Sequence, residues 1–264
     1  MSAVSAVPRP TLWQSVFEFR ALLEVMSLVP ARPMLKLAPS GEGQPVLVLP
    51  GFFAADGSTA KLRNYLKRKG FTPYAWELGR NPGLSEDIYL QLEQRVQELS
   101  EQHGGGTVSL VGWSLGGIYA RLLAHKLPEQ VRQVVTLGSP FNISQMGAVT
   151  GAVERLYERM NPNQREDPLL AQEELWKSPP PVPSTAIYSE GDGVAHWSFC
   201  VDEEDENTEN LQIPSSHLGM THNPLVLYAI ADRLAQQEGQ WRPFQLRSHI
   251  HETLLQAPRR MLLS

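Results

Sequence analysis

The five residues Gly112–Gly116 constrain the fold of this chain more than any other feature of its sequence. They read Gly-Trp-Ser-Leu-Gly and lie directly after the apolar run Val108–Val111 and directly before a helical pattern. A serine in this context occupies a sharp strand-to-helix turn, whose strained backbone costs on the order of 1–3 kcal/mol. Side chains two residues before and after the serine would collide with neighbouring backbone, so both positions favour glycine. We predict that the turn lifts the Ser114 hydroxyl above the edge of a sheet.

Short apolar runs alternate with helical patterns along most of the chain. We predict strands at residues 46–49, 71–76, 107–111, 131–137, 185–188 and 210–213, and helices at residues 58–69, 85–102, 115–127 and 224–235, with Ser85 capping the second helix. This alternation is typical of an α/β fold with a mostly parallel sheet and helices on both faces. Residues 141–183, after the fourth strand, are too long for a simple connection and predict a cap or lid insertion.

The 264 residues divide into three predicted parts: an N-terminal helical extension (1–40), a main α/β domain (41–240) and a C-terminal tail (241–264). The formal net charge of −5 argues against nucleic-acid binding, which needs a surface that neutralises phosphates. Cys200 is the single cysteine, so no intrachain disulfide can form and a cysteine-based metal site is disfavoured. We therefore expect a cytoplasmic location.

Residues 11–28 carry apolar side chains at helical spacing, namely Leu12, Val16, Phe19, Leu23 and Met26. Glu18, Arg20 and Glu24 interrupt any continuous apolar span, so the segment cannot cross a bilayer. We expect a helix packed across the domain. The alternative is weak contact with a membrane surface, which would make the protein peripheral to the membrane, although such helices usually carry more Lys and Arg.

A serine hydroxyl is a poor nucleophile unless a base and an orienting acid lie beside it. With a strand-to-helix serine, the acid and then the histidine follow later in the chain. Asp192 lies in a glycine-flanked turn after the strand 185–188, with Glu190 as its rival. For the base we favour His217, in the small-residue loop Ser215–Gly219, over His222, which adjoins the start of the last helix.

A second predicted feature is a pair of backbone N–H groups that would bind an oxyanion. Leu115 supplies one at the start of a helix, and Phe52 supplies the other in the loop after the first strand, where Gly51 lets the chain bend. Phe53 and Trp113 lie next to these residues in the sequence and indicate an apolar substrate pocket.

These motifs together resemble bacterial lipase- and esterase-like members of the α/β-hydrolase superfamily. The resemblance covers residues 44–236 and rests on Pro50-Gly51-Phe52, on Gly112–Gly117 and on Ser215–Gly219 before a proline-initiated helix. Pro50 replaces the histidine usual in the relatives' oxyanion loop. The expected donor is a backbone N–H one position beyond Gly51, so this departure changes the rigidity of the loop and leaves the donor in place.

The resemblance implies a serine hydrolase that cleaves carboxylic esters with an apolar acyl group, from small-molecule or lipid substrates. Ser114, His217 and Asp192 would form its catalytic triad, and no cofactor or metal is required. Two alternatives stay open: a thioesterase or acyltransferase that uses the same triad, and a non-catalytic scaffold of this fold with a surface-binding N-terminal helix.

Overall fold

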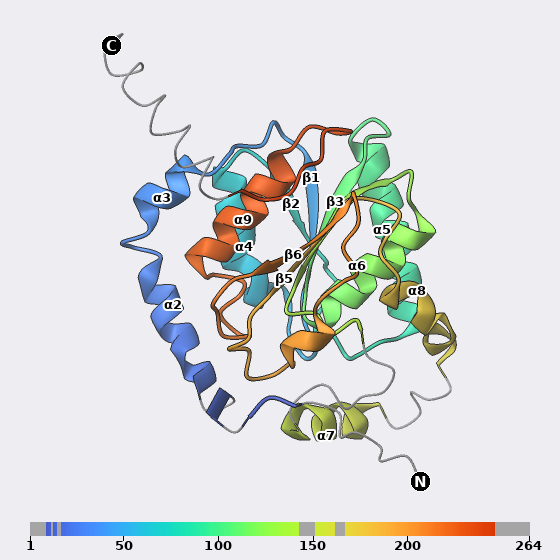
Figure 1. Cartoon of the computed structure of the whole chain (residues 1–264). Coiled ribbons are helices and arrows are strands. Elements are labelled where there is room, and N and C mark those ends of the chain that lie inside the picture. The colour runs from blue at the N-terminus through green and yellow to red at the C-terminus, as the bar shows by residue number, and fades with distance from the viewer. Residues whose placement is uncertain (1–8, 12, 15–16, 143–150, 162–166, 246–264) are drawn as a thin grey trace.

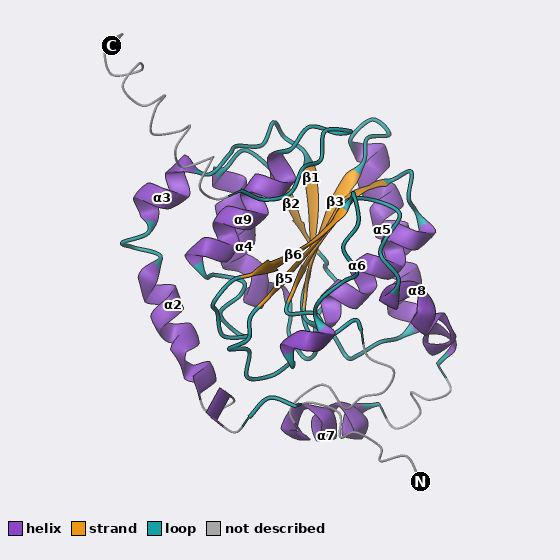
Figure 2. Ribbon diagram, viewed as in Figure 1, coloured by secondary structure: helices purple, strands orange, loops and turns teal. Residues whose placement is uncertain are grey.

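The computed structural model describes residues 9–245 apart from 12, 15–16, 143–150 and 162–166. Its centre is a six-stranded sheet in the order β2-β1-β3-β4-β5-β6 (Figure 2). Each neighbouring pair of these strands is parallel, which confirms the predicted sheet. The strands are β1 (Pro45–Leu49), β2 (Thr72–Ala75), β3 (Val108–Trp113), β4 (Val131–Leu137), β5 (Ser184–Tyr188) and β6 (Thr208–Gln212).

Helices cover both faces of the sheet (Figure 1). The main ones are α4 (Asp56–Arg68), α5 (Glu86–Gln102), α6 (Leu115–Lys126) and α9 (Pro224–Ala235). Ahead of β1 run η1 (Phe17–Arg20), α2 (Ala21–Ser27) and α3 (Arg32–Leu37). The stretch from β4 to β6 adds α7 (Gly151–Met160), η3 (Pro168–Gln172), α8 (Glu173–Lys177) and η4 (Trp197–Phe199).

The strands are apolar on both faces because each face packs on a helical layer. Leu47 and Leu49 of β1 belong to a core shared with α5 and α6. Val46 and Val48, which alternate with them, belong to a second core shared with α4 and α9. All four side chains are buried, so the continuous apolar run of β1 follows from its central place in the sheet.

Two helices begin in different ways, and one of them corrects the predicted cap. Asn223 caps α9, since its Oδ1 accepts the N–H of Leu225 at 2.9 Å, and Pro224 is the first helical residue. Ser85 occupies the cap position of α5, but its side chain makes no capping hydrogen bond. The Glu86 N–H donates instead to the carboxylate of Asp167, at 3.2 and 3.3 Å. That carboxylate comes from a distant segment, so the local sequence could not reveal it.

The connection from β4 to β5 holds α7, η3 and α8, and parts of it lie outside the described residues. Tyr157 of α7 contacts the ring of Phe52 with centroids 4.8 Å apart, and its hydroxyl accepts the N–H of Leu84 at 3.0 Å. Leu169 of η3 and Trp176 of α8 belong to the core that α6 lines. The predicted insertion is therefore present between these strands, and its action as a lid stays a prediction.

The N-terminal segment runs along the outside of the domain, past α9 and α4 (Figure 1). It packs there, but not with the apolar stripe seen in the sequence: Phe19, Leu23 and Met26 are 60–65% exposed. Leu12 and Val16, the other members of that stripe, lie outside the described residues. Polar contacts to the domain are made by Glu18, Arg20 and Glu24, which interrupt the stripe. Apolar contacts are made further along, by Leu28 and by Leu35 of α3, which pack on the core shared with α4 and α9. Among the described residues, no helix combines the length and apolar character needed to cross a bilayer.

A buried ion pair joins α6 to the loop before β6. The guanidinium of Arg121 pairs with the Asp202 carboxylate, and both side chains are at most 1% exposed. Arg121 also donates to the carbonyls of Lys177 at 3.1 Å and Ser178 at 2.6 Å, at the end of α8. Its charge stacks on the Phe141 ring, 3.8 Å from the centroid. One side chain thus ties the end of the β4–β5 connection to the helix beneath it.

We predict that Arg121→Met lowers the free energy of unfolding by about 3–5 kcal/mol, because it leaves the Asp202 carboxylate buried without its partner. Urea unfolding monitored by tryptophan fluorescence measures the change. Arg68→Met, at an exposed position on α4, serves as the matched control and should change stability little. The double variant Arg121→Met/Asp202→Asn should recover part of the loss, and a single variant as stable as the parent would contradict the prediction.

Candidate active site

Ser114 lies on the turn between β3 and α6 with φ 53° and ψ −123°. Few residues other than glycine adopt a positive φ, so the surrounding structure must hold this conformation in place. Its N–H donates to the carbonyl of Leu137, the last residue of β4, at 2.8 Å. The side chain is half-buried at the carboxyl end of the sheet, where α/β proteins commonly bind ligands.

The two glycines of the turn confirm the predicted steric reason for their presence. A Cβ on Gly112 would lie 2.4 Å from the carbonyl oxygen of Gly116, and a Cβ on Gly116 would lie 2.4 Å from that of Leu49. Both distances are far below van der Waals contact. Any other residue at either position would push α6 away from β1 and β3, and Ser114 would move with it.

Asp192 and His217 meet at the same end of the sheet. Asp192 follows β5 and His217 follows β6, and Nδ1 of the imidazole lies 2.6 Å from Oδ2 of the carboxylate. Both residues are buried, at 2% and 3% exposure. The other oxygen of Asp192 accepts the N–H groups of Val194 and Ala195, each at 2.8 Å. These two bonds orient the carboxylate toward His217.

The backbone of β4 connects this pair to Ser114. Gly138 directly follows Leu137, and a Cβ placed on it would lie 3.0 Å from Asp192 Oδ2 and 3.2 Å from His217 Nδ1. On the other side, the indole N–H of Trp113 donates to the His217 carbonyl at 3.1 Å, and the two rings are 5.7 Å apart. The structure thus gathers Ser114, Asp192 and His217 at one edge.

The rival residues have other surroundings. Glu190 is exposed, and its backbone carbonyl accepts the side-chain amide of Gln14 at 2.6 Å. His222 places Nε2 3.1 Å from the carbonyl of Ala21 and Nδ1 3.3 Å from the Thr221 hydroxyl. His222 thus contacts the N-terminal segment.

The loop after β1 lies against Ser114, since a Cβ on Gly51 would be 3.0 Å from the Ser114 Cβ. In the part of the chain that the structure describes, the N–H groups of Phe52 and Leu115 have no hydrogen-bond partner. Buried or half-buried backbone donors are rarely left unpaired, so these two are available to a bound group.

Asn81 holds this loop in place, and the sequence did not suggest it. Its side chain is fully buried and donates to the Pro50 carbonyl at 2.9 Å. Its backbone carbonyl accepts the N–H of Phe53, and its backbone N–H donates to the Ala54 carbonyl, each at 2.8 Å. Three hydrogen bonds from one residue therefore fix a turn in which Phe53 has a φ of 58°.

The two residues predicted to line a pocket differ in their surroundings. Trp113 is buried against His217. Phe53 is 40% exposed, with the guanidinium of Arg80 4.3 Å from the centre of its ring. That these two side chains line a substrate pocket stays a prediction.

Two acidic side chains of the N-terminal segment accept hydrogen bonds from the loops that carry Asp192 and His217. Glu18, 9% exposed, accepts the N–H groups of Gly193 at 2.8 Å and His217 at 2.9 Å on Oε1, and that of Leu218 at 3.0 Å on Oε2. Glu24 accepts the Ser216 N–H at 2.7 Å. In the sequence these residues only interrupt an apolar stripe, and no local signal points to partners some 200 positions away.

Charge and burial act in opposite directions on His217. Burial by itself lowers the pKa of His217 because it disfavours the imidazolium form. The negative charge of Asp192, its hydrogen bond to the ring and the charge of Glu18 together outweigh burial, so the pKa of His217 is raised above its ordinary value. A neutral imidazole bonded to Asp192 through Nδ1–H leaves Nε2 as the proton acceptor.

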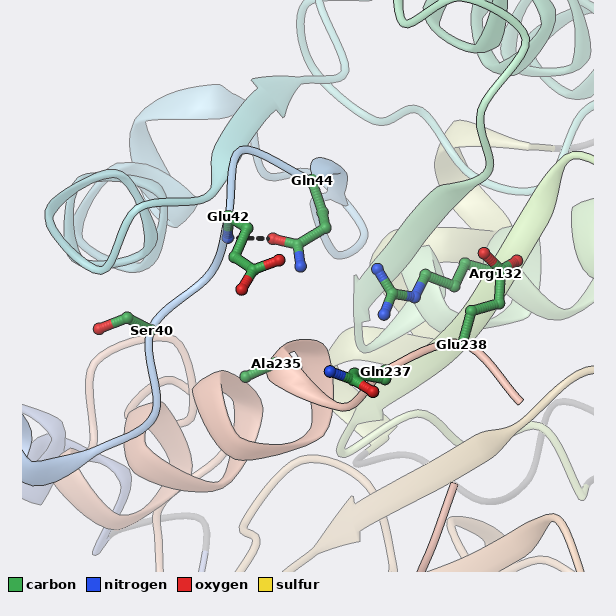
Figure 3. A pocket seen from close by; sticks show the side chains of 7 residues that line it. All are labelled: Ser40, Glu42, Gln44, Arg132, Ala235, Gln237 and Glu238. Carbon is green, nitrogen blue, oxygen red and sulfur yellow. Dashed lines mark hydrogen bonds between the residues drawn. The ribbon is translucent and has the colours of Figure 1, made fainter. Parts of the chain in front are cut away.

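A pocket of about 370 Å³ lies at the opposite edge of the sheet (Figure 3). Gln44, directly before β1, and Arg132, near the start of β4, place it at the amino ends of the strands. Its lining is almost entirely polar: Ser40, Glu42, Gln44, Arg132, Ala235, Gln237 and Glu238. It is therefore separate from the cluster around Ser114.

Comparison with known families agrees with this geometry. A family profile described as "alpha/beta hydrolase fold" matches residues 44–176, about half of the chain. The chain belongs to this family. No curated protein matches its sequence. The match includes the turn at Ser114 and the loop at Phe52, and it ends before Asp192 and His217.

Two solved structures share the fold of this α/β hydrolase at low sequence identity. Lipase B of Aspergillus fumigatus has a TM-score of 0.57 and 15% identity, covering 74% of this chain and 53% of its own. The chain therefore spans about half the length of that lipase. A structure from the metagenome-derived lipolytic enzymes LipS and LipT has a TM-score of 0.52 and 16% identity, covering 73% and 94%.

We predict that Asp192→Asn lowers the pKa of His217 to below its ordinary value. The substitution removes the carboxylate charge that raises this pKa, while burial of the ring, which lowers it, remains. NMR titration of the imidazole resonances measures the pKa of His217 in the parent α/β hydrolase and in Asp192→Asn. Glu203→Gln removes an exposed carboxylate and is the control, expected to leave the pKa of His217 unchanged. An unchanged or higher pKa in Asp192→Asn would contradict the assigned cause.

Proposed function

We propose that this α/β hydrolase is a serine hydrolase that cleaves carboxylic esters with an apolar acyl group. The observation that carries the proposal is the buried hydrogen bond between Asp192 and His217, at the edge where Ser114 lies on a strained turn. Membership of the family and the likeness in fold to lipolytic enzymes support hydrolysis as the class of reaction.

In the proposed reaction, Ser114 Oγ attacks the acyl carbonyl and His217 Nε2 accepts the hydroxyl proton. Asp192 holds the imidazole in the tautomer that leaves Nε2 free and stabilises the imidazolium that forms. His217 then donates the proton to the leaving alcohol, and an acyl-enzyme remains. Water, activated by the same imidazole, attacks this ester and restores Ser114.

The N–H groups of Phe52 and Leu115 are proposed to bind the oxyanion of each tetrahedral intermediate. Their lack of partners within the described chain and the place of Leu115 at the start of α6 support this role. Each such donor contributes roughly 3–4 kcal/mol in the transition state. Asn81 would keep the Phe52 donor in place through the loop it holds.

An apolar acyl group suits the side chains around the oxyanion loop. The Phe52 ring contacts Tyr157 of α7, and Phe53 is tilted against Phe52 with centroids 6.1 Å apart. Leu156 and Met160 of the same helix are exposed, at 40% and 39%. Apolar side chains on this helix and loop favour burial of an acyl chain over a charged or peptide substrate.

We predict that the protein reacts with a fluorophosphonate probe and hydrolyses p-nitrophenyl butyrate, and that Ser114→Ala abolishes both activities. The variant removes the nucleophile, so at least about 1,000-fold of the rate is lost. Fluorescence of the labelled band and release of p-nitrophenolate provide the two measurements.

Ser40→Ala changes an exposed serine at the far edge of the sheet and serves as the matched control, with labelling and hydrolysis retained. Circular dichroism verifies that each variant is folded. A folded parent protein that neither reacts with the probe nor cleaves the ester would overturn the proposal. Faster turnover of an acyl thioester than of the matching ester would favour the thioesterase alternative.

A further inference from the structure

We propose that Glu18 is a positioning residue for His217, so that the N-terminal segment forms part of the active site. This proposal rests on the function proposed above. Oε1 of Glu18 accepts N–H groups from both loops at once, that of Gly193 beside Asp192 and that of His217 itself. A single oxygen atom therefore bridges the two loops.

The bonds to Glu18 are of the strong kind. Hydrogen bonds from backbone N–H groups to a carboxylate are charge-assisted, and this carboxylate is nearly buried. Removing it takes away an acceptor from three backbone N–H groups, among them that of the buried His217, which is unfavourable. The loops would then shift to find other partners, and the Asp192–His217 bond would lose its alignment.

Neighbouring contacts fasten the same segment to the same loops. Arg20 donates to the carbonyls of Gly191 at 2.6 Å and Ser215 at 3.0 Å. Glu24 accepts the hydroxyl groups of Ser215 and Ser216, each at 3.1 Å. Glu18 differs from these residues because it bonds to His217 directly. Its effect on the imidazole can therefore be measured apart from its part in attaching the segment to the loops.

The charge of Glu18 gives the test a specific readout. The charges that raise the pKa of His217 are those of Asp192 and Glu18. The other titratable groups near Asp192 are His196, whose pKa is lowered by burial, and Cys200, whose pKa is raised by burial, so both are neutral near pH 7. Glu24, which bonds to Ser216, and Arg20, which bonds to Gly191 and Ser215, are the same in the parent and in a Glu18 variant. Loss of the Glu18 charge therefore lowers the pKa of His217.

The experiment compares Glu18→Gln and Glu18→Ala with the parent protein in ester hydrolysis across pH. We expect Glu18→Ala to lower kcat about 100-fold with little change in KM, as for a misplaced catalytic group. Glu18→Gln keeps one acceptor oxygen and should lose less. In both, the acid limb of the kcat/KM profile moves to lower pH because the His217 base stays neutral further into acid.

Glu174→Gln, at an exposed position on α8, is the control and should keep the parent's profile. If the parent reacts with the fluorophosphonate probe and Glu18→Gln shows the same kcat and acid limb, the positioning role is wrong while the proposed function stands. If the folded parent does not react with the probe at all, the proposed function is wrong, and the positioning role of Glu18 falls with it. A lower melting temperature with an unmoved acid limb would assign Glu18 a purely structural role.

A second inference comes from the opposite face of the same segment. Leu22, Leu23, Met26 and Val29 are 60–67% exposed, and we call these four residues the outer face. Scattered single apolar residues are common on surfaces, but four within eight positions form a patch. Leu218, which directly follows His217 and donates its N–H to Glu18, is also exposed, at 48%.

The charges near the outer face indicate which kind of partner surface it would bind. Both acids of the segment, Glu18 and Glu24, turn inward to the loops, as their hydrogen bonds show. On α3, which follows the outer face in the chain, the exposed charges are those of Arg32 and Lys36, and both are positive. The whole chain is anionic, at −5, so two exposed cations on the helix next to an apolar patch are a local exception. We propose that the outer face docks on the surface of a bilayer that contains anionic phospholipid.

Vesicle sedimentation of the full chain tests this docking. With phosphatidylcholine vesicles that include phosphatidylglycerol, we expect the parent protein to pellet, and less of it to pellet with phosphatidylcholine alone. Leu22→Gln/Leu23→Gln/Met26→Gln should lower the partition coefficient at least about 100-fold, because each glutamine removes apolar area from the contact. The matched control is Leu90→Gln/Leu175→Gln, at exposed leucines elsewhere, which should pellet like the parent.

Retention of the parent in the supernatant, or equal pelleting of the triple variant, would overturn the docking proposal. Sedimentation velocity without vesicles distinguishes a second copy as occupant: a dimer that the triple variant dissociates, with no vesicle binding, would assign the outer face to self-association. Circular dichroism and fluorophosphonate labelling verify that the triple variant keeps its fold and its site.

Discussion

The hydrogen bond between His217 and Asp192 is the interaction around which the rest of this end of the molecule is arranged. It lies in a buried environment, where an unpaired carboxylate would be costly and a poorly aligned one would not hold the imidazole. The N–H groups of Val194 and Ala195 occupy the second carboxylate oxygen, and the indole of Trp113 holds the His217 carbonyl. Together these contacts hold the Asp192–His217 pair in one arrangement. The proposed reaction needs such pre-organisation.

The parallel sheet explains how residues so far apart reach this pair. Strands β3, β5 and β6 all end at the same edge, so the loops that carry Ser114, Asp192 and His217 are neighbours there. The link from β4 closes the group, since Leu137 accepts the N–H of Ser114 and Gly138 contacts the Asp192–His217 pair. The amino edge, with its polar pocket at Arg132, has none of these groups.

The sequence predicted the sheet and the turn well because their causes are local. Apolar runs, a glycine at each side of Ser114 and a proline after Asn223 act within a few residues of the structure they produce. It failed where the cause lies far along the chain. The Asp167 carboxylate that caps α5 is 81 residues from Glu86, and Glu18 is 199 residues from His217. Asn81 gave no signal either, because a buried asparagine in a loop looks like any turn residue.

The same long separation has a consequence for how the molecule is made. The N-terminal segment is synthesised before its hydrogen-bond partners on the loops after β5 and β6, which follow 175 and 199 positions later. Contacts between distant residues form late, since the intervening chain must first become ordered. The sheet can thus assemble while the loops that carry Asp192 and His217 still lack their hydrogen bonds to Glu18. The contacts around the Asp192–His217 pair form in the nascent chain only when these distant segments meet.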